Sequence, residues 1–318
     1  MTVQAIDPSA EKEKHQAALT SVIAAVGLTT FKIIVGVLTG SLGILAEAAH
    51  SGLDLVAALV TLFAVKVSGR PADEEHTYGH GKVENFSALI ETLLLLATSA
   101  WIIYEGIQRL FFKTAEVEVN FWSFLVMVTA IVVDATRSRI LYRTAKKHNS
   151  QALEADALHF STDIWSSAVV ILGLILVKVS QIAPNLSFLH KADAVAAMGV
   201  AMIVIFVSVE LGVRTVQALL DKAPAGSEAK VKEIAESVAG VTDCHRVRVR
   251  PSGPVMFADI HVRMDGSLSV AEAHEKTLEI QKKVREVYPM MDVVVHTEPI
   301  KPVEAPKEPS GQDGNFPG

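Results

Sequence analysis

The sequence predicts an α-helical membrane protein with six transmembrane helices, followed by a small cytoplasmic α+β domain. Half of the 318 residues are hydrophobic (50%), only 20% are charged and the mean hydropathy is +0.35, which is more apolar than a soluble chain of this length. A membrane-spanning helix needs about 20 largely apolar residues, and six segments meet this requirement. These segments are 17–39, 42–66, 84–108, 121–143, 155–179 and 192–215.

The region before the first apolar segment is polar and mixed in charge, which is unlike a cleavable signal peptide. We therefore expect residues 1–15 to form a disordered tail and residues 16–216 to form the transmembrane domain. Basic residues concentrate in the loops after the second and fourth segments, and by the positive-inside rule these loops are cytoplasmic. The residues concerned are Lys66, Arg70, Lys82, Arg137, Arg139, Arg143, Lys146 and Lys147. Both termini are then expected in the cytoplasm.

The pattern changes in residues 217–300. AGSEAKVKEIAESVAG and SVAEAHEKTLEIQKKVREVY are predicted amphipathic helices, whereas HRVRVR, FADIHVRM and DVVVHTEP have the character of half-buried strands. The order αββαβ fits a two-layer α+β domain. Residues 301–318 are rich in Pro, Gly and charge, and we expect them to be disordered.

Charge and cysteine content exclude some classes of function. The net charge is −6 and no basic stripe interleaved with aromatic residues occurs, so no nucleic-acid partner is expected. The single cysteine, Cys244, permits neither an intramolecular disulfide nor a Cys-rich metal motif. We expect it to be a free, buried thiol, with a ligand role beside His245 as the alternative.

A His-x-x-x-Asp pair occurs in the second apolar segment, as His50 and Asp54, and again in the fifth, as His159 and Asp163. Each pair lies on one face of a helix, about 6 Å apart along its axis. Ionisable groups at membrane depth are costly and usually functional, and two imidazoles with two carboxylates suit tetrahedral Zn²⁺ better than Mg²⁺ or Ca²⁺. The alternative is that the pairs are hydrogen bonds between packed helices.

Three other ionisable residues lie in the same segments. Glu47 and Asp156 precede the two pairs by one turn, and they are candidates for orienting the ligands or accepting protons. Lys32 lies well inside the first segment, so pairing with a carboxylate is expected rather than extension to the interface.

Two further clusters are predicted outside the apolar segments. In the loop PADEEHTYGHGK, Asp73, His76 and His80 have the i, i+3, i+7 spacing that Glu47, His50 and Asp54 have in the second apolar segment. This spacing predicts a second metal site, with a solvated polar loop as the alternative. GHGK lacks the earlier glycine of a phosphate-binding loop. In the α+β domain, a dense set of potential ligands predicts a third site, with scattered exposed histidines as the alternative. These ligands are His245, His261, His274, His296 and Glu298.

The segments ILAEAAHSGLD, PADEEHTYGHGKVEN and DALHFSTD, together with six spans and the αββαβ tail, resemble the cation diffusion facilitator family. The pattern is most similar to the bacterial ferrous-iron/zinc efflux branch, and it covers about residues 15–300. The resemblance implies a homodimeric, proton-coupled exporter of divalent metals in a bacterial inner membrane. It also implies a metallochaperone-like fold for the cytoplasmic domain.

Residue by residue, the resemblance places the transport site on His50, Asp54, His159 and Asp163. It places the loop site and the cytoplasmic site on the two clusters above, and a charge interlock of the dimer on Lys82 and Asp221. The sequence departs from the branch at His50 and Glu298, where aspartate is common in both positions. His/Asp pairs on both helices resemble the zinc-selective members, whereas carboxylate-richer sites are associated with iron or cadmium.

We therefore expect a Zn²⁺/H⁺ antiporter that exports metal from the cytoplasm. Fe²⁺, Mn²⁺ or broader specificity is the alternative within the family. A metal-regulated membrane scaffold or sensor that does not transport is the alternative from another class, and a channel is poorly excluded by sequence. The chain is not expected to be an enzyme, because it lacks the His-Glu-x-x-His, Ser/Lys or Asp/Asp arrangements of intramembrane hydrolases.

Overall fold

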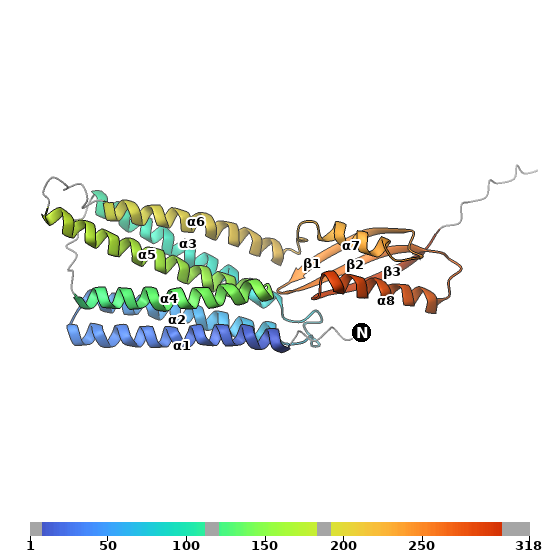
Figure 1. Cartoon of the computed structure of the whole chain (residues 1–318), viewed down its shortest axis with the longest axis horizontal. Coiled ribbons are helices and arrows are strands. Elements are labelled where there is room, and N and C mark those ends of the chain that lie inside the picture. The colour runs from blue at the N-terminus through green and yellow to red at the C-terminus, as the bar shows by residue number, and fades with distance from the viewer. Residues whose placement is uncertain (1–7, 112–120, 183–191, 301–318) are drawn as a thin grey trace, which may run out of the picture. The chain divides into compact units, whose positions relative to one another are not determined.

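The computed structural model describes residues 8–111, 121–182 and 192–300 (Figure 1). The chain divides into two compact units. The first contains the long helices, up to Pro224, together with Arg250–Met256, and the second contains the remaining residues from Ala225 onward. Of the predicted disordered tails, residues 1–7 and 301–318 lie outside the described residues.

The first unit contains six long helices in the part of the chain that the structure describes. They are α1 (Pro8–Thr39), α2 (Leu42–Ser68), α3 (Lys82–Phe111), α4 (Phe121–His148), α5 (Gln151–Ile182) and α6 (Ala192–Leu219). Within the described residues, four of these helices contain a stretch that is long and apolar enough to cross a membrane, namely α1, α2, α3 and α6. Charged residues such as Asp134, Arg137 and Arg139 make α4 more polar.

The first helix begins earlier than expected. The sequence predicts a disordered tail over residues 1–15, but residues 8–15 are helical from Pro8, a residue that is well tolerated in the first turn of a helix. The reason is a buried contact: Lys14 is 1% exposed, and its Nζ lies 2.8 Å from Glu84 Oε1 on α3. The partner lies 70 residues away in the sequence, so local composition does not reveal it.

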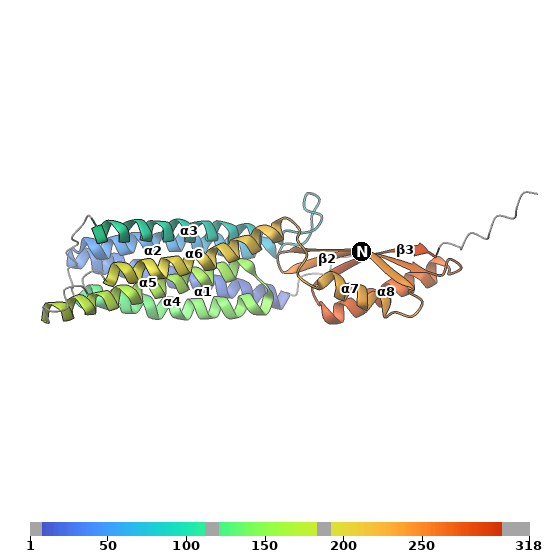
Figure 2. The same ribbon diagram turned by 90° about the horizontal axis from the view of Figure 1, so that it is seen from above.

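The helices form two groups within this unit. α1, α2, α4 and α5 pack against one another, whereas α3 packs mainly along α6 and also contacts α5 and α2 (Figures 1 and 2). α1 and α2 form a tight hairpin, in which Gly40 adopts a φ of 64° and the Ser41 side chain caps α2 by accepting from the Ile44 N–H. The hairpin and the contact of α2 with α5 bring the two His-x-x-x-Asp pairs into one unit.

The second unit has the predicted order αββαβ, with α7 (Ser227–Glu236), β1 (Asp243–Ser252), β2 (Val255–Met264), α8 (Val270–Val287) and β3 (Met291–Pro299). The sheet order is β1-β2-β3. Thr242 N–H donates to Arg263 O, and Ile300 N–H donates to Met264 O. The start of β1 and the end of β3 therefore lie beside the end of β2, so β1 is antiparallel and β3 parallel to the central strand.

Alternate residues of the strands form the core of this unit. Cys244, Ala258, Ile260, Val262, Met291 and Val293 are at most 2% exposed. Side chains alternate between the two faces of a strand, so the residues between them lie on the other face of the sheet. α8 is fixed at its start by a capping box, in which Ser269 and Glu272 satisfy each other's backbone N–H groups.

Candidate metal sites

The two His-x-x-x-Asp pairs meet between α2 and α5. His159 Nε2 lies 3.2 Å from Asp54 Oδ1 and 3.7 Å from Asp163 Oδ2. His50 Nε2 lies 3.9 Å from Asp54 Oδ1 and 3.9 Å from Asp163 Oδ1. Each imidazole therefore faces one carboxylate of its own helix and one of the neighbouring helix. We refer to these four residues as the quartet.

The spacing of the quartet fits a small tetrahedral ion. Zn²⁺ binds nitrogen and oxygen ligands at about 2.0–2.2 Å, which places tetrahedral ligand atoms about 3.4 Å apart. The four measured nitrogen–oxygen separations, from 3.2 to 3.9 Å, lie close to this value. Ligand atoms of His50, Asp54 and Asp163 also lie within 4.8 Å of one another. His159 is not in that group of three, so an ion held by all four side chains requires some of them to move.

Burial differs across the quartet. The side chains of His159 and Asp54 are 7% and 12% exposed, whereas that of His50 is 45% exposed. Four ionisable groups therefore converge at a place where three of them have little access to water, which is costly without a compensating charge. A bound cation is one such charge.

The residues one helical turn before the pairs make other contacts. Lys32 on α1 donates to Ser51 Oγ at 2.7 Å and pairs with Glu47 Oε2 at 3.2 Å, which agrees with the expectation that Lys32 finds a carboxylate. Asp156 is fully buried and accepts from Ser21 Oγ at 3.4 Å. In the described contacts, neither Glu47 nor Asp156 is bonded to a member of the quartet.

The long helices also contain buried ionisable groups, and one of them, Arg137, was expected in the loop after the fourth segment but lies inside α4. Arg137 on α4 pairs with Asp134 at 3.1 Å, donates to Ser21 Oγ, and has its guanidinium 3.4 Å from the centre of the Phe160 ring. Glu91 on α3 is also fully buried. The available signal was an ionisable residue inside an apolar run, as in ALIETLLLLA for Glu91.

The loop between α2 and α3 brings its three predicted ligands together. Asp73 Oδ1 lies 3.4 Å from His76 Nδ1, Asp73 Oδ2 lies 3.3 Å from His80 Nε2, and the two imidazole rings are 4.4 Å apart. Asp73 Oδ1 also accepts from the His76 and Glu75 backbone N–H groups. The His76 N–H bond is the main cause that lowers the pKa of Asp73, with a further contribution from the charge of His80. An ionised carboxylate is the form that binds metal.

The third cluster forms on the sheet face opposite α7 and α8, where the start of β1 meets the ends of β2 and β3. His261 Nδ1 lies 2.8 Å from Glu298 Oε1, and His245 Nε2 lies 3.3 Å from Glu298 Oε2. The His296 ring is 4.7 Å from that of His261. The hydrogen bond from His261 lowers the pKa of Glu298, and the charges of His245, His261 and Arg263 add to this effect.

Two features of this cluster differ from the predicted set. His274, on α8, is not in the described cluster; its Nδ1 lies 3.4 Å from Thr277 Oγ1 on the same helix. Asp243 was not predicted, yet its Oδ2 lies 3.2 Å from His245 Nδ1. Cys244 points to the opposite face of the sheet and is buried, and burial raises the pKa of its thiol to about 11. A neutral thiol facing the core is not placed to join the cluster.

The predicted interlock residues form an ion pair. Lys82, the first residue of α3, places Nζ 2.8 Å from Asp221 Oδ1 just after α6. Both side chains are about two-fifths exposed, at 41% and 42%. The pair joins the ends of α3 and α6, the two helices that pack together.

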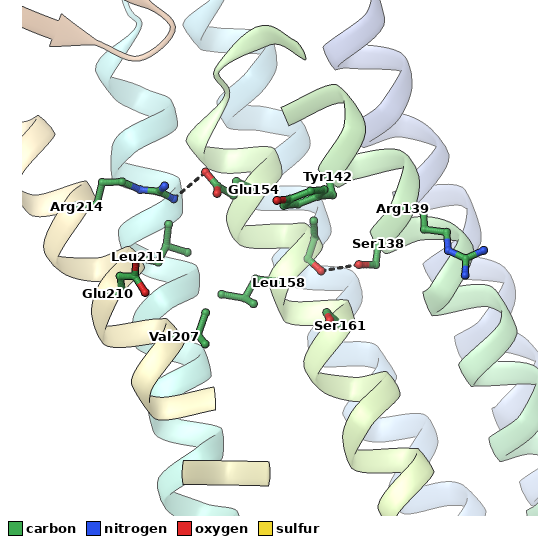
Figure 3. Close-up of a pocket in the computed structure, with 11 residues that line it drawn as sticks. Ser138, Arg139, Tyr142, Glu154, Leu158, Ser161, Val207, Glu210, Leu211 and Arg214 are labelled. Carbon is green, nitrogen blue, oxygen red and sulfur yellow. Dashed lines mark hydrogen bonds and ion pairs between the residues drawn. The ribbon is translucent and has the colours of Figure 1, made fainter. Parts of the chain in front are cut away.

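A separate cavity of about 400 Å³ lies between α4, α5 and α6 (Figure 3). Its lining includes Tyr142, Glu210 and the ion pair of Arg214 with Glu154, whose atoms are 2.7 Å apart. No member of the quartet lines this cavity. It is therefore distinct from the candidate transport site.

Two family models match the chain. A cation efflux transmembrane domain matches residues 18–220, and the cytoplasmic domain of cation efflux proteins matches residues 223–300. Among relatives, a protein named cation-efflux pump FieF from Yersinia enterocolitica is 31% identical over 306 residues, covering 95% of this chain and 98% of the relative. The protein of the same name from Cronobacter sakazakii is 31% identical over 302 residues, covering 95% and 96%.

Two solved structures each match about a quarter of the chain. One is described as the zinc form of a putative zinc transporter, CzrB, and has 22% identity and a TM-score of 0.23, covering 24% of this chain and 89% of that chain. The other is the metal-bound C-terminal domain of the CzcD transporter from Thermotoga maritima, with 35% identity and a TM-score of 0.22, covering 23% and 87%.

Proposed function

This chain belongs to the cation efflux family, the cation diffusion facilitators, and from that premise we propose that it exports Zn²⁺ from the cytoplasm in exchange for protons. Family membership makes it an integral membrane transporter of divalent cations. The observation that carries the finer proposal is the quartet, in which two imidazoles and two carboxylates from α2 and α5 lie at the spacing of tetrahedral zinc ligands.

Proton exchange follows from the chemistry of these ligands. An imidazole must be neutral and a carboxylate ionised to bind the metal, so protons and metal compete for the same atoms. At the neutral pH of the cytoplasm the quartet loads Zn²⁺. When the helices move so that the site faces the other side, protons displace the ion. His50 and His159 are suited to this exchange because an imidazole that binds metal in its neutral form can take up a proton when the metal leaves.

Six membrane-spanning helices place both termini on the same side of the membrane. Basic residues near the ends of α2 and α4, including Lys66, Lys146 and Lys147, support a cytoplasmic location for that side. The membrane is a bacterial inner membrane, and the protein acts as a homodimer in which the Lys82–Asp221 pair stabilises the junction. Metal at the loop and sheet clusters regulates transport.

The preference for zinc depends on His50. A nitrogen ligand in this position makes the site softer than one with three carboxylates, and imidazole suits Zn²⁺ well. Fe²⁺, Mn²⁺ and Cd²⁺ remain the alternative cargo. A competition flux assay in proteoliposomes, comparing the wild type with His50→Asp, tests this point. The variant is expected to transport relatively more Fe²⁺ or Cd²⁺, and unchanged selectivity would remove the reason for preferring zinc.

Transport itself is tested by Zn²⁺ flux into proteoliposomes with an imposed proton gradient. Asp54→Ala and Asp163→Ala are expected to lose flux, whereas Glu210→Gln, an exposed position on α6, retains it. Wild-type flux in either Ala variant would make the quartet the wrong site. No flux in the wild type would favour a scaffold or sensor, and flux that ignores the proton gradient would refute antiport alone.

A further inference from the structure

Among the described residues, His159 lacks the hydrogen bond that normally orients a metal-binding imidazole. Its Nε2 faces Asp54 and Asp163, at 3.2 and 3.7 Å. Its Nδ1 is buried and has no hydrogen-bond partner in the described part of the chain. A histidine that binds metal usually donates its other ring N–H to a carboxylate, a carbonyl group or water, which fixes the ring. The orientation of the His159 ring therefore depends on the side chains that pack against it.

Phe160, the next residue on α5, packs against this imidazole. The two rings meet edge to face, with their centroids 5.5 Å apart and their planes at 79°. Aromatic pairs favour this arrangement. Phe160 is 0% exposed, so its ring can turn only if its neighbours move. The position of the Phe160 ring consequently limits where the His159 ring can lie.

The guanidinium of Arg137 on α4 lies over the face of the Phe160 ring, 3.4 Å from its centre. The same guanidinium is held at its edge by two other side chains. Arg137 Nη1 donates to Asp134 Oδ1 at 3.1 Å, and Nη2 donates to Ser21 Oγ at 3.1 Å. Since the donors of a guanidinium lie in one plane with fixed directions, these bonds set the orientation of that plane. α1 and α4 thus hold a flat, charged support for an aromatic ring on α5.

Further contacts of the same residues reach the same turn of α5. Ser21 Oγ, which accepts from Arg137, donates to Asp156 Oδ2 at 3.4 Å. Ser138, the residue after Arg137, donates to Ala157 O at 2.9 Å. Asp156 and Ala157 lie within one turn of the quartet histidine on α5. The turn of α5 that carries this histidine is therefore fixed by contacts at and beside Arg137.

Stability alone does not account for an arginine in this position. Arg137 is 5% exposed and Asp134 is 7% exposed, and taking such charges out of water is costly. A buried ion pair can often be replaced by apolar side chains of similar volume without loss of stability. An apolar side chain lacks the planar charge that binds the face of an aromatic ring. A geometric role for the guanidinium explains what stability does not.

We propose that Arg137 is a positioning residue for the quartet. It holds the Phe160 ring and, through that ring, keeps His159 turned toward Asp54, so that the metal-binding nitrogen is in place before the ion arrives. Ligands that are held in their bound arrangement bind more tightly, because less side-chain freedom is lost on binding. The inference rests on the proposed function, to which it adds a residue that is not itself a ligand.

The test is the Zn²⁺ affinity of Arg137→Met in the full-length protein. The measurement is made in a background that carries Asp73→Asn and His261→Gln, which remove one ligand each from the loop site and the sheet cluster. Methionine keeps an apolar chain beside Phe160 but has neither charge nor donors. We expect the affinity to fall about tenfold, as is typical when a group that orients a metal ligand is lost. A loss of less than about threefold would overturn the inference.

A double-mutant cycle separates positioning from a general effect on the fold. In a His159→Ala background, Arg137→Met should weaken Zn²⁺ binding by less than about threefold, because the side chain that it positions is already absent. In a His50→Ala background the loss of about tenfold should remain, because His50 lies on α2 and is not adjacent to the Phe160 ring. Equal losses in the two backgrounds would mean that Arg137 does not act through His159, and would refute the inference.

Arg139→Met is the matched control, because it makes the same change two residues further along α4 at an exposed position (Figure 3). Its Zn²⁺ affinity should stay within about twofold of the background protein. If it falls as much as that of Arg137→Met, the effect is not specific and the inference fails. Failure of the proposed function has another signature, namely no zinc flux in the wild type or full flux in Asp54→Ala.

Phe160→Leu covers the case in which Arg137→Met does not fold. This change removes the aromatic ring but leaves the bonds of Arg137 to Asp134 and Ser21 in place. If the ring transmits the effect to His159, Phe160→Leu should also weaken Zn²⁺ binding about tenfold. An affinity equal to that of the background protein would show that the ring does not position the histidine, and would overturn the inference.

Discussion

The buried polar groups of the membrane helices and the exposed polar groups of the loop and sheet use the same residue types under different constraints. In the quartet, Asp54 and His159 are largely buried and are held by two packed helices. In the loop site, the side chains of Asp73 and His76 are 52% and 55% exposed. When no metal is present, water can solvate Asp73 and His76, but it can solvate Asp54 and His159 only slightly.

Because of this difference in exposure, the quartet and the loop site are suited to different roles. In the proposed exchange, metal and protons would compete for the buried ligands, because a change of charge at buried groups must be compensated. An exposed set loses less when the ion leaves, so it suits reversible regulation. Three pairs of matched substitutions, each at a buried or clustered residue and at an exposed or isolated counterpart, test this difference, and the pH dependence of one carboxyl group in the sheet cluster tests it further.

The largest expected effect is on stability, from Lys14→Met compared with Lys82→Met. Lys14 is 1% exposed and pairs with the fully buried Glu84, which also accepts from Ser68 at 2.8 Å. Removing one partner of a buried ion pair costs about 3–5 kcal/mol, whereas losing the exposed pair of Lys82 costs about 0–1 kcal/mol. Thermal unfolding of both variants in detergent measures the difference, and equal losses would contradict it.

The second prediction compares Asp163→Asn with Asp73→Asn. Both changes replace a carboxylate by an amide of the same shape. The first removes one of four ligands at a buried site and should weaken Zn²⁺ binding there about 100-fold, or about 2.7 kcal/mol. The second should leave zinc flux in proteoliposomes within about threefold of the wild type, a change of less than 1 kcal/mol. If Asp73→Asn abolishes flux as well, the loop site is part of the transport path.

The quartet could be predicted from the sequence because a helix fixes which residues share a face. His159 and Asp163 are one turn apart in any helix, and the repeated pair on α2 indicated where they would meet. The extension of α1 could not be predicted, because Lys14 is buried by Glu84, which lies 70 residues away. Glu91 was visible as an acid in an apolar run, but its hydrogen bond with Thr61 on α2 depends on helix packing.

The residues that meet in the sheet cluster could also be predicted only in part from the sequence. The strands were predicted, yet which residues meet depends on strand order and register. The parallel pairing of β3 with β2 brings Glu298 to His261, and the antiparallel pairing of β1 brings Asp243 and His245 to the same end of the sheet. His274 is on a helix that packs on the other face. Its closeness to the other predicted ligands in the sequence therefore did not bring it into the cluster.

The third prediction compares His261→Gln with His274→Gln in the full-length protein. Zn²⁺ at about 100 times its dissociation constant stabilises a protein that binds it only when folded by about 2.7 kcal/mol. The His261 variant should lose most of the zinc-dependent rise in unfolding temperature of the cytoplasmic domain, and the His274 variant should keep it. An equal loss in the two variants would place His274 among the ligands.

The smallest effect is on pH dependence, and it concerns Glu298. The His261 hydrogen bond and neighbouring positive charges lower the pKa of this carboxyl group below its ordinary value of 4.5. A lowered pKa in the folded state adds stability above pH 4.5 and loses it as the pH falls through the folded value. With a chelator present, the difference in unfolding temperature between wild type and Glu298→Gln should therefore shrink below about pH 4.5. A difference that stays constant over this range would mean that the hydrogen bond to His261 does not depend on the charge of Glu298, and that the sheet cluster resembles an ordinary polar surface more than a metal site.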